Sequence, residues 1–127
     1  MMANAYVDAS VLLAVSLGDP AGPAVRQRLR AFTVLLSAPL LEAELRAAWR
    51  REGVAPDPAL LGEVAFTTYG GSLSAEIQRV LDAGYLRGAD CWHVATALHL
   101  DPSATRLTFL TLDERQRAVA EDLGFRT

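Results

Sequence analysis

Two aspartates of this 127-residue chain directly follow short apolar runs that have the character of buried strands. Asp8 follows residues 5–7, Asp113 follows residues 107–112, and a helical pattern begins after each aspartate. In open parallel sheets, ligands bind beyond the carboxyl ends of the strands. We therefore expect both carboxylates at one edge of a sheet, where they could serve a functional site.

A third carboxylate, Glu44, interrupts the apolar face of a helix expected over residues 39–52. At about 100° per residue, Glu44 lies between Leu41 and Ala48 on that face, whereas Glu42 lies at its border. A buried carboxylate is unfavourable unless it pairs with a cation or binds a metal. Glu44 therefore either pairs with an arginine at the edge of the core or belongs to the site, and Glu42 is the next candidate.

Asp90 is the fourth candidate and stands near the start of a helix expected over residues 88–100. Aspartate is a favoured N-cap residue, so this position fits a helix cap and a functional site equally well. His93 lies on a different side of the same helix, and we expect it to be packed and hydrogen-bonded rather than a ligand. Trp49 and Trp92 are expected to pack in the core or at an interface.

These four carboxylates come from four separate elements and would repel one another strongly if they met without protons or cations. Oxygen-only ligands suit Mg²⁺ or Mn²⁺, and metals held in this way are common in enzymes that hydrolyse phosphodiesters. The net charge of −3 argues against nucleic acid as a partner. That objection weakens because the four site carboxylates carry four negative charges, which leaves the rest of the chain at +1.

The elements that would position these side chains alternate between strand and helix. Strands are expected at residues 6–8, 33–37 and 107–112, and helices at 10–17, 22–32, 39–52, 58–66, 75–84, 88–100 and 114–123, with an irregular segment at 67–74. This alternation predicts βαβ units, and thus an α/β fold with a short, mainly parallel sheet flanked by helices. The near-continuous apolar strands fit a sheet that is covered on both faces.

The composition fits one ordinary globular domain over residues 1–127. Hydrophobic residues make up 51% of the chain, and the single cysteine, Cys91, excludes an internal disulfide and a cysteine-based zinc site. The first residues are not basic and Asp8 interrupts their apolar stretch. We therefore expect no signal peptide, no membrane span and a location in the cytoplasm.

Four segments of the chain carry a family likeness: YVDASVLL, EAELRAAW, LRGADCWHVATAL and FLTLDERQRAVAEDLGF. Together, and in this order, they resemble the PIN-domain family, and in particular the VapC-type toxins of toxin–antitoxin pairs. By motif position, the acidic site residues of the family fall on the same four carboxylates: Asp8, Glu44, Asp90 and Asp113. The small hydroxyl residues near the family's site fall on Ser10 and Thr111.

This resemblance implies a three-layer α/β/α fold and a Mg²⁺- or Mn²⁺-dependent endoribonuclease whose substrate is RNA. The four acidic residues would be both catalytic and metal-binding, with Ser10 and Thr111 in support. It also implies a homodimer that a cognate antitoxin protein holds inactive. The chain departs from the family pattern in two places: residues 67–74 supply only a poor strand, and Trp92 is bulkier than the residue common at its position.

Other α/β folds with aspartates at strand ends fit less well. A response-regulator receiver needs a lysine, and all 12 basic residues here are arginine. A haloacid-dehalogenase-type phosphatase needs a second aspartate where Ser10 stands, and a dinucleotide site needs a glycine-rich turn that this sequence lacks. The remaining alternative is a non-catalytic PIN domain that acts as an RNA-binding or protein-interaction module.

Overall fold

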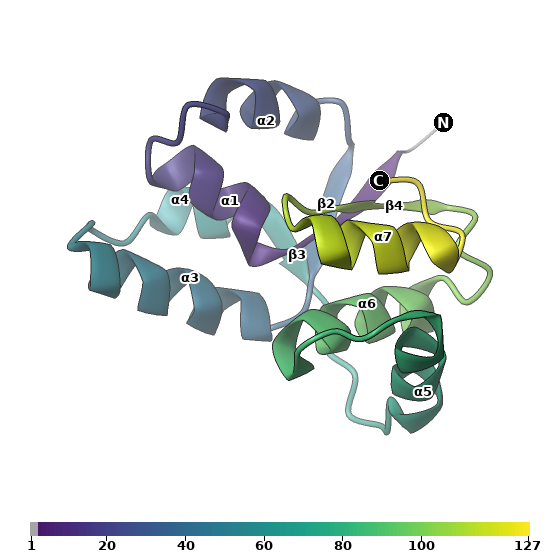
Figure 1. Cartoon of the computed structure of the whole chain (residues 1–127). Helices are drawn as coiled ribbons and strands as arrows, with labels where there is room; N and C mark the ends of the chain where they lie inside the picture. The colour runs from purple at the N-terminus through teal and green to yellow at the C-terminus, as the bar shows by residue number, and fades with distance from the viewer. Residues whose placement is uncertain (1–2) are drawn as a thin grey trace.

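The structure, a computed structural model, describes residues 3–127 and alternates strands with helices (Figure 1). The elements are β1 (Asn4–Val7), α1 (Ala9–Ser16), α2 (Gly22–Leu29), β2 (Val34–Ser37), α3 (Leu40–Glu52), α4 (Pro58–Leu61), β3 (Val64–Phe66), α5 (Ser74–Ala83), α6 (Gly88–Leu100), β4 (Leu107–Leu110) and α7 (Glu114–Asp122). Among these residues, no helix is both long enough and apolar enough to cross a membrane.

The four strands form one parallel sheet in the order β3-β2-β1-β4. β1 lies inside the sheet, where Ala5 is paired with Leu35 of β2 and with Thr108 of β4. The carboxyl ends of β1 and β4 are therefore neighbours, with Val7 opposite Leu110. This arrangement confirms the predicted α/β fold with a parallel sheet flanked by helices.

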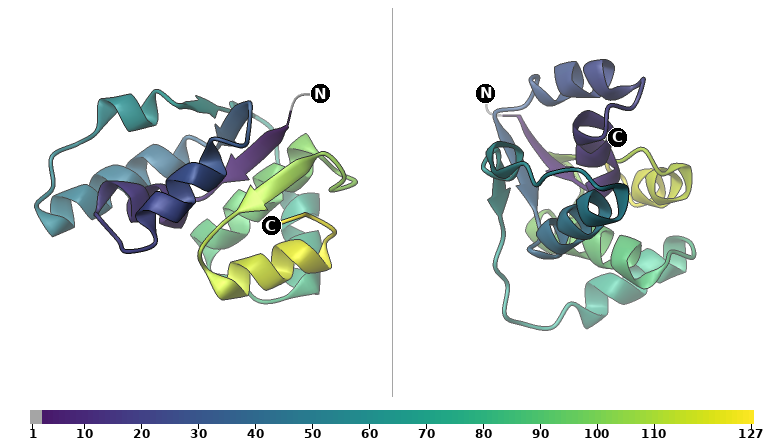
Figure 2. Two further views of the ribbon diagram at one scale, coloured as in Figure 1. Left: turned by 90° about the horizontal axis from the view of Figure 1, so that it is seen from above. Right: turned by 90° about the vertical axis from the view of Figure 1, so that its left-hand side faces the viewer.

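Helices cover both faces of the sheet (Figures 1 and 2). Successive residues of a strand point to opposite faces, so Val7 joins a core with α1 to α4, whereas Tyr6 joins a core with α5 to α7. Leu35 and Leu36 divide between the two cores in the same way. The sheet is thus the middle of three layers, and its strands are apolar on both sides, as their composition predicted.

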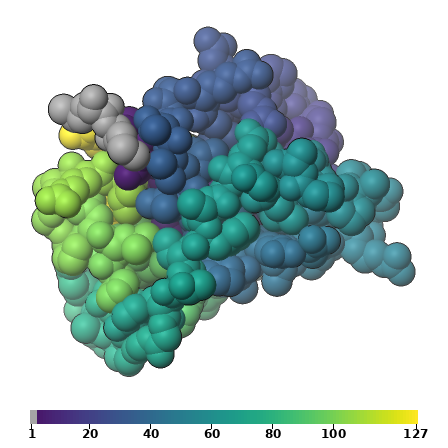
Figure 3. All heavy atoms as spheres, turned by 180° about the vertical axis from the view of Figure 1, so that it is seen from behind, coloured from purple at the N-terminus to yellow at the C-terminus, as the bar shows by residue number. Residues whose placement is uncertain are grey.

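The segment between α3 and α5 differs from the sequence-based expectation. The helix expected over residues 58–66 ends at Leu61, and Val64–Phe66 instead forms β3 beside β2. A β-branched and an aromatic residue favour a strand, and Val64 reaches the core from the edge of the sheet. In Figure 3 this teal segment runs across the surface towards α5 and α6. Residues 67–73 form no strand, so the third strand precedes the segment in which we looked for it.

The other boundaries move by only a few residues. α3 ends at Glu52, as expected, and Gly53 follows it with a φ of 68°, the left-handed conformation that glycine adopts readily. α2 ends at Leu29 rather than residue 32. β1 ends at Val7 rather than Asp8, and β4 ends at Leu110 rather than Leu112.

Candidate active site

Asp8 lies where the chain turns from β1 into α1. Its backbone N–H donates to Leu110 O at 3.2 Å, and its side chain caps α1 by accepting the Ser10 N–H at 2.6 Å. The Ser10 hydroxyl also donates to Oδ1 at 2.6 Å, and the Thr111 hydroxyl donates to Oδ2 at 3.0 Å. Burial raises the pKa of Asp8, and these hydrogen bonds oppose that shift. Both predicted hydroxyl residues therefore orient this one carboxylate.

Thr111 connects Asp8 to the start of α7. Its hydroxyl oxygen accepts the Asp113 N–H at 3.0 Å, and its one hydrogen is shared between Asp8 Oδ2 and Gln116 Oε1, which lies 2.7 Å away. Gln116 is fully buried, and its side-chain amide donates to Asp90 O at 3.2 Å. Gln116 thus joins α7 to α6 beneath the site, a role that the sequence analysis missed because a glutamine inside a helix has no motif of its own.

Asp113 caps α7 by accepting the Gln116 N–H at 2.8 Å. Asp90, in contrast, caps nothing: Arg87 stands at the N-cap position of α6, and Asp90 lies in the first turn. Of the two roles left open for Asp90, the structure therefore excludes the cap. The side chain of Asp90 is half-buried, and no hydrogen bond from residues 3–127 stabilises its carboxylate.

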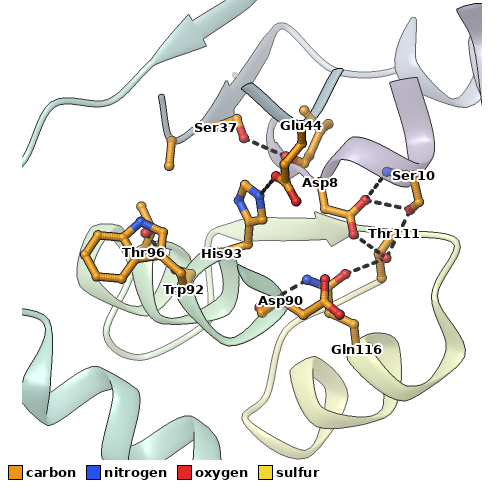
Figure 4. A network of polar contacts seen from close by, with 12 residues as sticks. Asp8, Ser10, Ser37, Glu44, Asp90, Trp92, His93, Thr96, Thr111 and Gln116 are labelled. Carbon is orange, nitrogen blue, oxygen red and sulfur yellow. Dashed lines mark hydrogen bonds and ion pairs between the residues drawn. The ribbon is translucent and has the colours of Figure 1, made fainter. Parts of the chain in front are cut away.

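The four predicted carboxylates approach one another at this edge of the sheet. Burial raises the pKa of Asp90, and the negative charges of Asp8, Asp113 and Glu44 raise it further in that order. Figure 4 shows Asp8, Glu44 and Asp90 turned towards a common space. Within the described residues, no three His, Cys, Asp or Glu side chains are gathered closely enough to hold a metal ion as they stand.

Glu44 reaches the site from α3 and is paired with a histidine. His93 Nε2 lies 2.5 Å from Glu44 Oε1 (Figure 4). The other ring nitrogen, Nδ1, lies 2.8 Å from Tyr6 Oη. The alternative of an arginine partner is wrong, because Arg46 pairs with the neighbouring Glu42 at 2.7 Å. His93 is 1% exposed and bonded at both nitrogens, which confirms the expectation of a packed, hydrogen-bonded histidine.

Two arginines that the sequence analysis did not select border the carboxylates. A hollow of about 320 Å³ is lined by Asp90 and Asp113 together with Arg87, Arg115 and Leu86. Both arginines are exposed. Their proximity in sequence was the available signal, since Arg87 lies three residues before Asp90 and Arg115 two after Asp113. The hollow therefore combines acidic walls with a cationic rim.

One of the comparisons with known proteins, the one with protein families, bears on this architecture. No curated protein and no solved structure matches the chain significantly. The PIN domain family matches residues 5–122, a span that runs from β1 to the end of α7 and contains all four carboxylates. The chain therefore belongs to the PIN-domain family.

Proposed function

We propose that this protein is a Mg²⁺- or Mn²⁺-dependent endoribonuclease that acts as the toxin of a toxin–antitoxin pair in the cytoplasm. PIN domains are generally nucleases, which gives the class of reaction. The observation that carries the proposal is the repulsion that three neighbouring carboxylates exert on Asp90. Its pKa is raised by burial and by Asp8, Asp113 and Glu44, and such a cluster of like charges favours the binding of a cation.

The four carboxylates suit a hard divalent cation, because their donor atoms are oxygens and they are negatively charged. Asp8, Glu44, Asp90 and Asp113 would hold it, because carboxylate oxygens are the ligands that Mg²⁺ and Mn²⁺ prefer. When bound, such a metal lowers the pKa of a coordinated water and stabilises charge on phosphate oxygens. Ser10 and Thr111 would keep the Asp8 carboxylate in a fixed orientation through their hydrogen bonds.

The arginine rim would bind the RNA backbone. Guanidinium groups bind phosphate well, and Arg87 and Arg115 border the hollow that contains Asp90 and Asp113. The carboxylates alone would repel a phosphodiester, so these two cations would offset that repulsion at the entrance. Contacts of this kind bind RNA without reading its sequence.

Neither histidine of the chain is placed to remove a proton from the ribose 2′-hydroxyl. Both nitrogens of His93 are engaged within the protein, and His99 packs against Tyr69, with the ring centroids 3.8 Å apart and the rings tilted by 35°. The nucleophile would therefore be water, and the products would carry 5′-phosphate and 3′-hydroxyl ends. Attack by the 2′-hydroxyl would instead leave 2′,3′-cyclic phosphates.

The decisive experiment is cleavage of a mixed RNA pool by the pure protein, with Mg²⁺ or Mn²⁺ and with EDTA. We expect cleavage only with metal, and 5′-phosphate ends on the products. Cyclic phosphate ends, or full activity in EDTA, would refute the proposal. RNA that is bound but left intact would support the alternative of a non-catalytic RNA-binding module. The Asp113→Asn variant, purified in the same way, is the control for contaminating nuclease.

The antitoxin would lie in a groove beside the site. This groove, of about 560 Å³, runs between α1 and α2 on one side and the β4–α7 connection on the other, with apolar walls and two arginines, Arg28 and Arg117. Trp49 takes no part in this groove: it is fully buried, as one of its two expected roles required, and it donates to Ser16 Oγ at 2.8 Å. Expression of this chain alone should arrest bacterial growth, and co-expression of the adjacent gene product should restore it; harmless expression of active enzyme would refute the toxin role.

Two copies of the chain would form a homodimer. Exposed apolar side chains of α6 and of the connection between α5 and α6 support this proposal, since Trp92 and Leu100 are each 40% exposed and Tyr85 is 67% exposed. Sedimentation equilibrium should give twice the chain mass. A monomer at all concentrations would exclude the dimer without bearing on the nuclease activity.

A further inference from the structure

Three of the segments that carry the predicted carboxylates meet at one buried side chain, that of Gln116 on α7. Its Nε2 donates to the backbone oxygen of Asp90 at 3.2 Å, and its Oε1 lies 2.7 Å from the Thr111 hydroxyl (Figure 4). The backbone N–H of the same residue donates to Asp113 Oδ1 at 2.8 Å. Thr111 in turn contacts Asp8 Oδ2 at 3.0 Å, so a single residue connects three of the four acidic segments.

The orientation of the Gln116 amide follows from its partner on α6. A backbone carbonyl oxygen can only accept a hydrogen bond, so the group that faces Asp90 O is the amide nitrogen. The amide oxygen therefore faces Thr111 and shares the hydroxyl hydrogen with Asp8 Oδ2. A flipped amide would place two oxygens 3.2 Å apart with no hydrogen between them, which is unfavourable in the core.

Burial restricts this side chain to one arrangement. Gln116 is 0% exposed and Thr111 is 4% exposed, so water does not replace a partner that is lost. A buried amide is unfavourable unless both of its ends are hydrogen-bonded, and here both ends are. The side chain therefore fixes the distance between the first turn of α6 and the connection from β4 to α7.

The hydrogen bond to Asp90 O opposes a repulsion. Asp90 caps no helix, and its carboxylate is next to the negative charges of Asp8, Asp113 and Glu44. Like charges favour movement of the first turn of α6 away from the other carboxylates. Gln116 holds the backbone of that turn against α7, and so keeps Asp90 at the site.

We infer that Gln116 is a positioning residue that sets the distance from Asp90 to Asp8 and Asp113, and thereby the affinity of the site for a divalent cation. Because it is fully buried, it acts only through Thr111 and the backbone of Asp90. The inference rests on the proposed function only in taking these carboxylates as metal ligands. A glutamine that merely stabilised α7 would affect folding and leave the metal affinity unchanged.

The hydrogen bonds of Gln116 can be measured on the unaltered protein. The chain has three glutamines and one asparagine, and both Gln27 and Gln78 are exposed. Hydrogen exchange of the side-chain amides, followed in ¹⁵N–¹H correlation spectra, should therefore be slowest for Gln116. The variant Gln116→Met assigns this amide through the loss of its signals. Exchange as fast as that of Gln27 and Gln78 would overturn the inference.

Gln116→Met also separates positioning from packing. Methionine has a similar shape and keeps the backbone N–H that donates to Asp113, so only the side-chain hydrogen bonds are lost. We expect the Mn²⁺ dissociation constant, measured by calorimetry, to rise about tenfold. Val119→Ala is the matched control, because Val119 is buried on the same helix and its side chain is a hydrocarbon. It should lower the Tm and keep the dissociation constant within about twofold of the wild type.

Equal Mn²⁺ affinity of Gln116→Met and wild type, with both folded by circular dichroism, would refute the positioning role. An equal loss of affinity in Val119→Ala would refute it as well, since the loss would then follow from weaker packing of α7.

A double-mutant cycle without metal tests the same role independently. Asp90→Asn removes the repulsion that the hydrogen bond from Gln116 opposes. In EDTA it should therefore raise the Tm of Gln116→Met by less than half as much as it raises the Tm of the wild type. Equal gains would refute the positioning of Asp90. A wild type that binds no Mn²⁺ but shows unequal gains would refute the metal-dependent nuclease and retain the positioning role.

Discussion

Asp90→Asn should stabilise the metal-free protein although it removes a site residue. The substitution eliminates repulsion from Asp8, Asp113 and Glu44, and it breaks no hydrogen bond that offsets this repulsion. Each like-charge neighbour at a partly exposed position contributes a few tenths of a kcal/mol after solvent screening, so three contribute about 1 kcal/mol. For a chain of this length that free energy corresponds to a rise in Tm of about 3–5 °C.

The pH dependence of this gain has a defined sign. The pKa of Asp90 is raised in the folded protein above its ordinary value of 3.8, so the folded state binds the proton more tightly than the unfolded chain does. The penalty for the charged carboxylate is therefore full above the folded pKa and is relieved as the pH falls through it. The difference in Tm between Asp90→Asn and wild type should be largest near neutral pH and should vanish by about pH 4.

Thermal unfolding followed by circular dichroism, in EDTA and then in Mn²⁺, tests this reasoning. Mn²⁺ should raise the Tm of the wild type above that of Asp90→Asn, because the ligand stabilises only a state that binds it. Asp82→Asn is the matched control, since Asp82 is exposed on α5 and its contact with the Gln78 amide can be kept by asparagine. A lower Tm for Asp90→Asn in EDTA would refute the account of mutual repulsion.

Three further outcomes follow from the same contacts. Asp113→Asn should keep the fold, because asparagine is an equally good N-cap, while RNA cleavage measured on a labelled substrate falls at least about a hundredfold. Thr111→Val should lower the free energy of unfolding in urea by about 2 kcal/mol, because the Asp113 N–H and Asp8 Oδ2 lose their partner. Arg87→Ala or Arg115→Ala, each added to the Asp113→Asn protein, should weaken RNA binding measured by fluorescence anisotropy and make that binding less dependent on salt. If the salt dependence of RNA binding does not change, these arginines do not contact the RNA.

The strand ends were the part of the site that the sequence predicted best. A carboxylate that directly follows a buried strand of a parallel sheet lies at the carboxyl edge of that sheet. The positions of Asp8 and Asp113 could therefore be predicted from local pattern alone. Glu44 was found by helical periodicity, but its partner was not. The contact with His93 joins residues 49 positions apart, and helix geometry carries no information about which helix lies opposite.

The third strand shows where local pattern is insufficient. Val64–Phe66 has three residues, too few for a period of two to be distinguished from the end of a helix. These residues form a strand because they pair with the edge of β2, and β2 lies far from them in the sequence. Arg87 and Arg115 were not predicted for a related reason. An exposed arginine is not part of a hydrophobic pattern, so the sequence does not show that it lies beside the carboxylates in the fold.

The two aspartates that cap α1 and α7 have a consequence for reading related sequences. Asp8 and Asp113 each set where a helix begins, so selection for folding alone would retain them in a descendant that had lost catalysis. Asp90 and Glu44 cap no helix, and burial and the neighbouring carboxylates disfavour the charged form of Asp90. Under the proposed function, loss of Asp90 or Glu44 in a relative would therefore mark an inactive member, whereas the presence of Asp8 and Asp113 would be uninformative about activity.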